Sequence, residues 1–315
     1  MTIATIALDR ADPTSLETAL TDIGFVQVID HEISPALINA VRRSLIEYFA
    51  LSDAAKMADQ ITRDNYRGFI PLGFFSPNQG GGGADRYEGY KLHAEVAVDD
   101  PIRTECDLYG PNRWPESTPD VRRFVSAYWR ECDRVSTVLL GIIAEILDVN
   151  VETFLAKFSS PLTNMTLLHY PPQSADEAGV GIHAHKDTDV LTMLINDPAG
   201  GLFVKARTSD DWIEVAGPPD ALIVNVGDML ELFSGGRLVS TPHKVVNSTG
   251  AERYSFPYFV VPRHDVVVAA LVEPLDGFDR SPVHVGDVSR EVWRTNWPDT
   301  ESSRPEFDLG TLANA

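Results

Sequence analysis

Residues 183–187 read His183-Ala184-His185-Lys186-Asp187, and this stretch is the strongest indication of fold and function in the chain. His185 and Asp187 are two positions apart, and side chains two apart in a β-strand project from the same face. An imidazole and a carboxylate on one face can both reach a single metal ion. We therefore expect His185 and Asp187 to bind one metal from a single extended segment.

A histidine further along the chain, His243, is a candidate for a third metal ligand. It lies in the run Ser240–Val246, which must form a different strand. Two imidazoles and one carboxylate form the facial triad that holds non-haem Fe(II) and leaves positions open for substrate and oxygen. His183 is a rival ligand, because His183 and His185 also have strand spacing, and spacing alone does not choose between His183 and Asp187.

A second pair with strand spacing, Arg253 and Ser255, follows ten residues after His243. The planar guanidinium of an arginine matches a carboxylate, and a serine hydroxyl adds a hydrogen-bond donor. Residues Tyr254 to Val261 are mostly apolar and predict a buried strand, in which a charged arginine requires an anionic partner. The pair therefore indicates a carboxylate-binding site.

The order of these motifs, His-x-Asp, a distal His and then Arg-x-Ser, resembles the Fe(II)/2-oxoglutarate-dependent dioxygenases, in particular the isopenicillin N synthase-like branch. The resemblance is dense from Asn164 to Pro262 and weaker within the first 50 residues. Further matching segments, in the same order as in the family, are Leu168–Pro172, Thr192–Leu194, Gly200–Leu202, Trp212–Val215, Asn225–Asp228 and Gly235–Arg237.

The resemblance implies a mainly β fold with flanking helices, in which a double-stranded β-helix (a cupin-like jelly roll) holds the metal between its two sheets. It chooses Asp187 over His183, so that His185, Asp187 and His243 are the expected ligands of Fe(II). The cosubstrate 2-oxoglutarate is expected to chelate the iron through its keto-acid end, and O2 is the oxidant. The other end is expected to contact Arg253 and Ser255, with a further hydrogen bond from Tyr170.

The implied activity is oxidation of a small molecule, by hydroxylation, desaturation, epoxidation or cyclisation, in specialised metabolism. Three alternatives stay open. Zn²⁺ accepts the same ligand types in hydrolases, although those enzymes do not need an arginine one strand beyond the distal ligand. An isopenicillin N synthase-like oxidase would share the triad without using 2-oxoglutarate. A non-enzymatic cupin-like binding protein would show no oxygen consumption.

The bulk composition indicates an ordinary globular protein that can bury a large core. The chain has 315 residues, of which 43% are hydrophobic and 23% charged, with a net charge of −20. Such a charge argues against nucleic acid and anionic membranes as partners. Only two cysteines and no long apolar run occur, so we expect a cytoplasmic protein without disulfides. The oligomeric state is left open.

We expect a single domain over residues 1–315 in three consecutive parts. Residues 1–160 are predicted to be largely helical with one early strand, and the helices begin near Pro13, Pro35 and Pro119. Residues 164–270 are predicted to form the jelly-roll core, and residues 271–315 an extension with a helix at Val288–Trp297. The predicted core strands are Asn164–His169, Val190–Ile195, Leu202–Lys205, Trp212–Val215, Ala221–Val226, His243–Val246, Tyr254–Val261 and Val266–Ala270.

The segment from Gly68 to Lys91 is predicted to be a long loop, because it contains four consecutive glycines and no strand or helix period. We expect this loop to be either a lid over the metal site or an insert without a role. Lys91 aligns with a segment that lines the substrate pocket in the resembling family, so we expect it either to pair with an anionic group of the substrate or to be a surface lysine. Asn225 and Asp228 are expected to shape a turn.

Overall fold

The structure is a computed structural model that describes residues 2–75, 85–173, 180–205, 210–247, 250–295 and 297. Its helices are α1 (Pro13–Asp22), α2 (Pro35–Phe49), α3 (Asp53–Met57), α4 (Ile102–Glu105), α5 (Pro119–Ile146), α6 (Val151–Ala156), α7 (Asp228–Phe233), α8 (Val285–Thr295) and the 3-10 turn η1 (Leu8–Arg10). Its strands are β1 (Ala4–Ala7), β2 (Phe25–Ile29), β3 (Gly68–Ile70), β4 (Glu88–His93), β5 (Asn164–Tyr170), β6 (Val180–His185), β7 (Leu191–Ile195), β8 (Leu202–Lys205), β9 (Trp212–Glu214), β10 (Leu222–Val226), β11 (His243–Val246), β12 (Arg253–Ser255), β13 (Tyr258–Val260), β14 (Val267–Val268) and β15 (Val283–His284).

Two sheets form the body of the described chain. The larger, here called the major sheet, has the strand order β1-β2-β10-β7-β13-β5-β4-β3, with β12 paired to β5 as well. The smaller, the minor sheet, has the order β6-β11-β8-β9. Apolar side chains from both sheets pack together in one cluster, for example Leu194 and Ile223 against Val204 and Val245. The two sheets therefore face each other, as in the predicted jelly roll.

The period of two along each strand decides which side chains lie between the sheets. On β10, Leu222, Val224 and Val226 belong to the core on the outer side of the major sheet. Ile223, between them, belongs to the cluster between the sheets. Asn225 has the same parity as Ile223, so it also faces the minor sheet.

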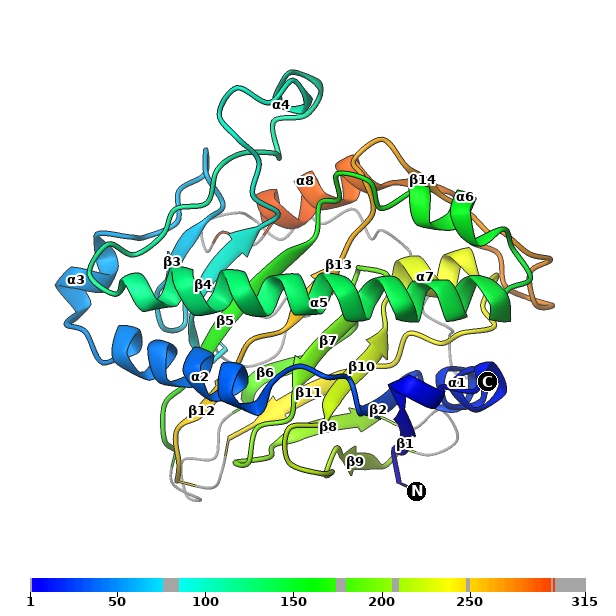
Figure 1. The fold of residues 1–315 in the computed structure, drawn as a ribbon, viewed down its shortest axis with the longest axis horizontal. Coiled ribbons are helices and arrows are strands. Elements are labelled where there is room, and N and C mark those ends of the chain that lie inside the picture. The colour runs from blue at the N-terminus through cyan, green and yellow to red at the C-terminus, as the bar shows by residue number, and fades with distance from the viewer. Residues whose placement is uncertain are drawn as a thin grey trace.

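Helices cover the outer face of the major sheet, where α5 runs across the strands with α2 beside it (Figure 1). The 28 residues of α5 give a length of about 42 Å. Its buried stripe includes Leu139 and Ile143, which join Val224 of β10 in one core. The three helices expected after prolines begin at Pro13, Pro35 and Pro119, as predicted.

Several element boundaries differ from the prediction. The strand expected over Val266–Ala270 is shortened to β14, which pairs with β15 in a separate two-stranded sheet and not in the jelly roll. The strand expected over Tyr254–Val261 is two strands, β12 and β13, which pair with opposite ends of β5. Pro257 lies between them, and a proline cannot donate to a ladder of backbone hydrogen bonds. The last helix begins at Val285 rather than Val288.

The expectation of a loop without regular structure from Gly68 to Lys91 is wrong at both ends. Gly68 pairs with Lys91, and Ile70 with Gly89, in an antiparallel β3–β4 pair at the edge of the major sheet. The burial pattern of β4 lacks alternation, since five of its six residues are buried, which explains why no period of two marks it. The four glycines fall in residues 76–84, outside the described residues.

Candidate metal centre and its surroundings

The two candidate histidine ligands lie opposite each other in the minor sheet. His185 ends β6, His243 begins β11, and the two are register partners whose ring centres are 4.4 Å apart. Asp187 lies two residues beyond the end of β6, outside its ladder of backbone hydrogen bonds. The Asp187 carboxylate comes within 3.6 Å of His185 Nε2 and 3.5 Å of His243 Nε2.

The hydrogen bonds of both rings leave their Nε2 atoms free to bind a cation. His185 Nδ1 lies 2.8 Å from the carbonyl of His183, and His243 Nδ1 lies 3.2 Å from that of Thr241. A carbonyl only accepts, so each Nδ1 carries the proton and each Nε2 presents a lone pair. Burial lowers the pKa of His243, which keeps its ring neutral.

Three electron-pair donors thus converge, with ligand atoms that all lie within 4.8 Å of one another. Lone pairs and a carboxylate this close repel one another unless a cation lies between them, and two neutral imidazoles with one carboxylate suit Fe(II). The site therefore fits the expected metal. His183 is not part of it, because its Nδ1 pairs with Asp85 Oδ1 at 2.6 Å.

The Asp187 carboxylate is held from the major sheet. Thr192 Oγ1 and Asn225 Nδ2 donate to its Oδ2 at 2.6 and 2.8 Å. Burial alone would raise the pKa of Asp187, but the two histidines and these two hydrogen bonds bring it below its usual value. Asn225 lies in β10, so the expectation that it shapes a turn is wrong, and its side chain contacts a candidate metal ligand.

Asp228 and Asp189 complete this support. The backbone N–H of Asp228 donates to the carbonyl of Asp187 at 2.8 Å. Asp189 Oδ2 lies 3.0 Å from Thr192 Oγ1, whose single proton is already given to Asp187. Burial and the charge of Asp187 raise the pKa of Asp189 well above its usual value, and the contact with Thr192 opposes this rise.

The predicted carboxylate clamp also lies between the sheets. Arg253 is opposite Tyr170 and Ser255 is opposite Leu168 in the β12–β5 register, and all of these side chains are buried. Arg253 Nε donates to the carbonyl of Gly200 at 2.9 Å, and its guanidinium lies 4.8 Å from the centre of the Tyr170 ring. Its Nη1 is buried without a hydrogen-bond partner among the described residues. A buried cationic donor left open in this way fits an anionic ligand.

The Tyr170 ring connects the two sheets. A Cβ on Gly181 of β6 would lie 2.9 Å from Tyr170 Cδ1 and 3.1 Å from Val245 Cγ1, closer than side chains normally approach. Only a glycine lets the ring lie there. Burial raises the pKa of Tyr170 to about 12, although the charge of Arg253 opposes this rise, so the phenol stays protonated and can donate a hydrogen bond.

Lys91 lies within β4 and is not the end of a loop. It pairs with Thr166 of β5, so both side chains share the inner face of the major sheet with Tyr170. Its Nζ donates to Asn164 Oδ1 at 2.6 Å and to Thr166 Oγ1 at 2.9 Å. Burial lowers its pKa to about 7, against the opposing effect of Asp189 and Asp187. Lys91 is therefore not the solvated surface lysine of the alternative expectation.

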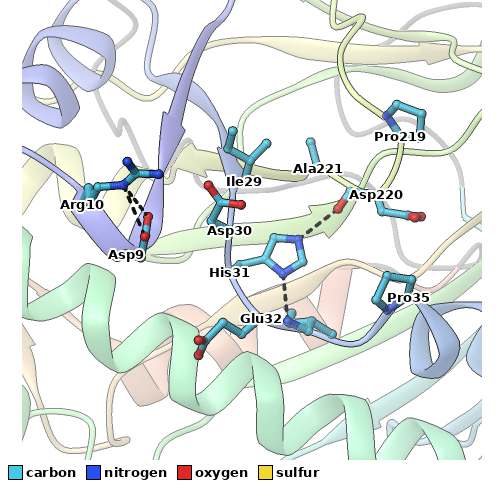
Figure 2. Close-up of a pocket in the computed structure, with 11 residues that line it drawn as sticks. Asp9, Arg10, Ile29, Asp30, His31, Glu32, Pro35, Pro219, Asp220 and Ala221 are labelled. Carbon is cyan, nitrogen blue, oxygen red and sulfur yellow. Dashed lines mark hydrogen bonds and ion pairs between the residues drawn. The ribbon is translucent and has the colours of Figure 1, made fainter.

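A separate surface hollow lies where β2 leads into α2 (Figure 2). The His31 ring in its wall bonds within the protein: its Nε2 lies 2.9 Å from the carbonyl of Asp220, and its Nδ1 accepts from the N–H of Ile33 at 3.1 Å. Ile29 in its wall is four residues, or about 13 Å, along β2 from Phe25, whose ring is 5.5 Å from that of His243. The hollow is thus remote from the triad.

Two family models match the chain. Residues 162–262 match the 2OG-Fe(II) oxygenase superfamily, and residues 10–117 match the non-haem dioxygenase in morphine synthesis N-terminal family. The first range contains the triad and the clamp, and the second contains α1, α2, β3 and β4. None of the helices in the described ranges is long and apolar enough to cross a membrane.

Curated and structural relatives agree with these matches. A 2-oxoglutarate-Fe(II) type oxidoreductase of Aspergillus fumigatus is 31% identical, with 79% of this chain and 75% of the relative covered. A putative 2OG-Fe(II) oxygenase family protein of Caulobacter crescentus has a TM-score of 0.77 at 26% identity, with 93% and 98% covered. JOX2, solved with 2OG, Fe and JA, has a TM-score of 0.78 at 25% identity, with 96% and 88% covered.

Proposed function

The chain belongs to the 2OG-Fe(II) oxygenase superfamily and is an Fe(II)- and 2-oxoglutarate-dependent oxygenase, and from this premise we propose which residues carry the reaction. His185, Asp187 and His243 hold the iron, while Arg253, Ser255 and Tyr170 hold the distal end of 2-oxoglutarate. The single observation that carries the proposal is the convergence of three metal-ligand groups within 4.8 Å, in a chain that also buries an arginine whose Nη1 has no partner among the described residues.

Iron and 2-oxoglutarate, when bound, supply the oxidation: O2 is reduced, the 2-oxo acid is converted to succinate and carbon dioxide, and the substrate loses electrons. The protein's own part is binding and orientation. Thr192 and Asn225 hold Asp187 Oδ2, Arg253 aligns the cosubstrate with a charge-assisted bond, and apolar side chains such as Phe25 and Leu168 exclude water.

The substrate we propose is a small molecule of specialised metabolism, oxidised by hydroxylation, desaturation, epoxidation or cyclisation at this one centre. The JOX2 structure, which holds 2OG, Fe and JA, supports a small organic molecule as the occupant of the corresponding space. The Aspergillus fumigatus relative is a 2-oxoglutarate-Fe(II) type oxidoreductase, and this similarity favours the proposed function over an oxidase that does not use 2-oxoglutarate.

The test measures iron content and succinate. The purified chain is reconstituted anaerobically with Fe(II), dialysed, and given 2-oxoglutarate and air. We expect about one iron per chain and slow succinate formation without added substrate. His185→Ala, Asp187→Ala and His243→Ala should each lose iron and succinate formation while keeping the thermal unfolding transition of the wild type, because these groups bind metal and do not fill the core.

His183→Ala is the matched control, since His183 is a histidine of the same strand whose side chain pairs with Asp85. It should retain iron. Wild-type iron content in any of the three ligand variants, or loss of iron only in His183→Ala, would contradict the ligand assignment.

A further inference from the structure

We propose that Lys91, Asn164 and Thr166 form a subsite, here called the Lys91 subsite, that binds a carboxylate of the substrate, so that the enzyme acts on small organic acids. The inference rests on the proposed function, because it assigns Arg253 to 2-oxoglutarate and leaves Lys91 to the second substrate. The motifs around the metal do not indicate this class of substrate.

The hydrogen bonds of the Lys91 subsite leave only donors to face a ligand. An ammonium group can only donate, so its two contacts fix the amide oxygen of Asn164 and the hydroxyl oxygen of Thr166 as the atoms that face it. The third ammonium proton, the Asn164 Nδ2 group and the Thr166 hydroxyl proton then remain. Three donors around one cationic centre suit an anion and do not suit a cation.

The charge of the Lys91 subsite calls for one negative charge. Within the described residues the ammonium donates to neutral oxygens only, and burial disfavours its charged form. Asp189 and Asp187 offer partial compensation in the metal-free protein, and a bound iron would take up the charge of Asp187. A single carboxylate restores the balance, whereas a phosphate dianion would require a second cationic group.

The register places the Lys91 subsite beside the metal centre. Lys91 Nζ lies 5.1 Å from the centre of the Phe259 ring. Phe259 is opposite Thr192 in the β13–β7 pair, and Thr192 donates to Asp187. β5 and β13 lie between β4 and β7, so the backbone of Lys91 is three strand spacings, or about 14 Å, from Thr192. The Lys91 side chain spans part of this distance, because its ammonium reaches the Phe259 ring on the strand next to Thr192. A substrate carboxylate held there would leave its carbon skeleton close to the iron.

The 2-oxoglutarate clamp is a different place on the same face. Arg253 is opposite Tyr170 and Lys91 is opposite Thr166. These two β5 residues are four positions apart, or about 13 Å along the strand. A five-carbon diacid that is chelated to iron at one end and bound to Arg253 at the other has no free carboxylate for Lys91.

The experiment compares matched pairs of probes, a set of aryl- and alkylacetic acids and their primary amides, as stimulators of succinate formation. In the wild type we expect kcat/KM for the preferred acids to exceed that for their amides at least tenfold. Lys91→Met, which keeps the length and removes the charge, should lower kcat/KM for the acids about ten- to a hundred-fold and lower that for the amides much less. Lys91→Arg should restore part of the preference.

Lys205→Met is the matched control, because the Lys205 side chain is 40% exposed and pairs with Asp210 in the minor sheet; it should behave like the wild type. Equal response of the wild type to acids and amides, or an equal loss for both in Lys91→Met, would overturn the Lys91 subsite. If no probe stimulates turnover, equilibrium dialysis decides: an acid bound no more tightly than its amide also overturns it. Absence of succinate from the wild type without any probe would instead count against the proposed function.

Discussion

At the level of single residues, the support of Asp187 matters as much as the ligands themselves. A carboxylate ligand must present one oxygen to the metal, and the other oxygen is held here by Thr192 and Asn225. Groups that orient metal ligands through hydrogen bonds commonly change metal affinity ten- to a hundred-fold when removed. The two residues lie on neighbouring strands of the major sheet, opposite each other in the β10–β7 register.

Asn225→Ala should therefore weaken iron binding by about ten- to a hundred-fold, because one of two donors to Asp187 Oδ2 is lost. The measurement is the Fe(II) dissociation constant in anaerobic competition with a chelator. Asn196→Ala removes an amide from an exposed contact with the carbonyl of Gly217 and should bind iron like the wild type. Unchanged iron affinity in Asn225→Ala would show that Thr192 alone suffices.

Arg253→Met should raise the 2-oxoglutarate concentration needed for half-maximal binding by about ten- to a hundred-fold, since a charge-assisted contact is lost. Iron affinity should stay the same, because Arg253 does not touch the triad. The readout is anaerobic titration of the iron-loaded protein with 2-oxoglutarate. Arg10→Met, at a side chain that is 78% exposed, is the control. Overlapping titration curves for Arg253→Met and the wild type would show that Arg253 does not bind 2-oxoglutarate.

Lys91 makes the response to acids depend on pH. Burial lowers its pKa from 10.5 to about 7, so the free protein carries the ammonium below pH 7 and loses it above. Carboxylic acids with pKa values near 4 stay ionised over this range. We therefore expect the affinity for the acid probes to fall by up to about tenfold per pH unit above pH 7. In Lys91→Arg the side chain stays charged, so the affinity should not change with pH over this range. A rise in affinity with pH in the wild type would contradict this assignment.

At the level of elements, β6 is confined by its neighbours in both sheets. It pairs with β11 in the minor sheet, and its Gly181 lies under the Tyr170 ring of the major sheet. The strand also ends at His185, two residues before Asp187. Gly181 is thus linked to the metal ligands through a few residues of the chain and to the clamp through its close approach to the Tyr170 ring.

Gly181→Ala should lower the free energy of unfolding by about 1–3 kcal/mol, because the new Cβ overpacks against Tyr170 and Val245. It should also weaken 2-oxoglutarate binding through displacement of the ring. Gly141→Ala is the contrasting variant: it lies inside α5 and its Cβ would meet nothing within 4 Å, so stability should increase by about 0.5–1 kcal/mol. Chemical denaturation measures the free energy of unfolding of both variants. Equal changes in the two would contradict overpacking at Gly181.

At the level of the whole molecule, two cores flank the major sheet. One lies between the sheets and surrounds the site, and the other lies between the sheet and helices such as α5. We propose that the helical residues 1–160, the core 164–270 and the extension from 271 form a single domain. In that case the outer core should contribute to stability without altering the metal centre.

Leu139→Ala should lower the free energy of unfolding by about 2–5 kcal/mol and leave the iron affinity unchanged, because this 1% exposed side chain fills the outer core. The neighbouring Val138 is 41% exposed, and Val138→Ala should change stability by no more than about 0.5 kcal/mol. Calorimetry should show one unfolding transition that shifts as a whole. Two separate transitions would argue for independent parts and against a single domain.

Much of this arrangement could be read from the order of residues. Prolines in the first turn mark the starts of α1, α2 and α5, because proline is compatible with that position and with little else in a helix. The types and order of His185, Asp187, His243 and Arg253 predicted the metal centre and the clamp, since few other arrangements call for those chemical groups in that order.

Folding in three dimensions decided the rest, because it depends on register between strands that are distant in the chain. Asn225 reaches Asp187, and Lys91 shares a face with Thr166, through pairings that no local pattern encodes. Asp187 lies just beyond the strand that carries His185, and its carboxylate meets two rings held by β6 and β11. A shift of one residue in any of these registers would turn the side chains to the opposite face.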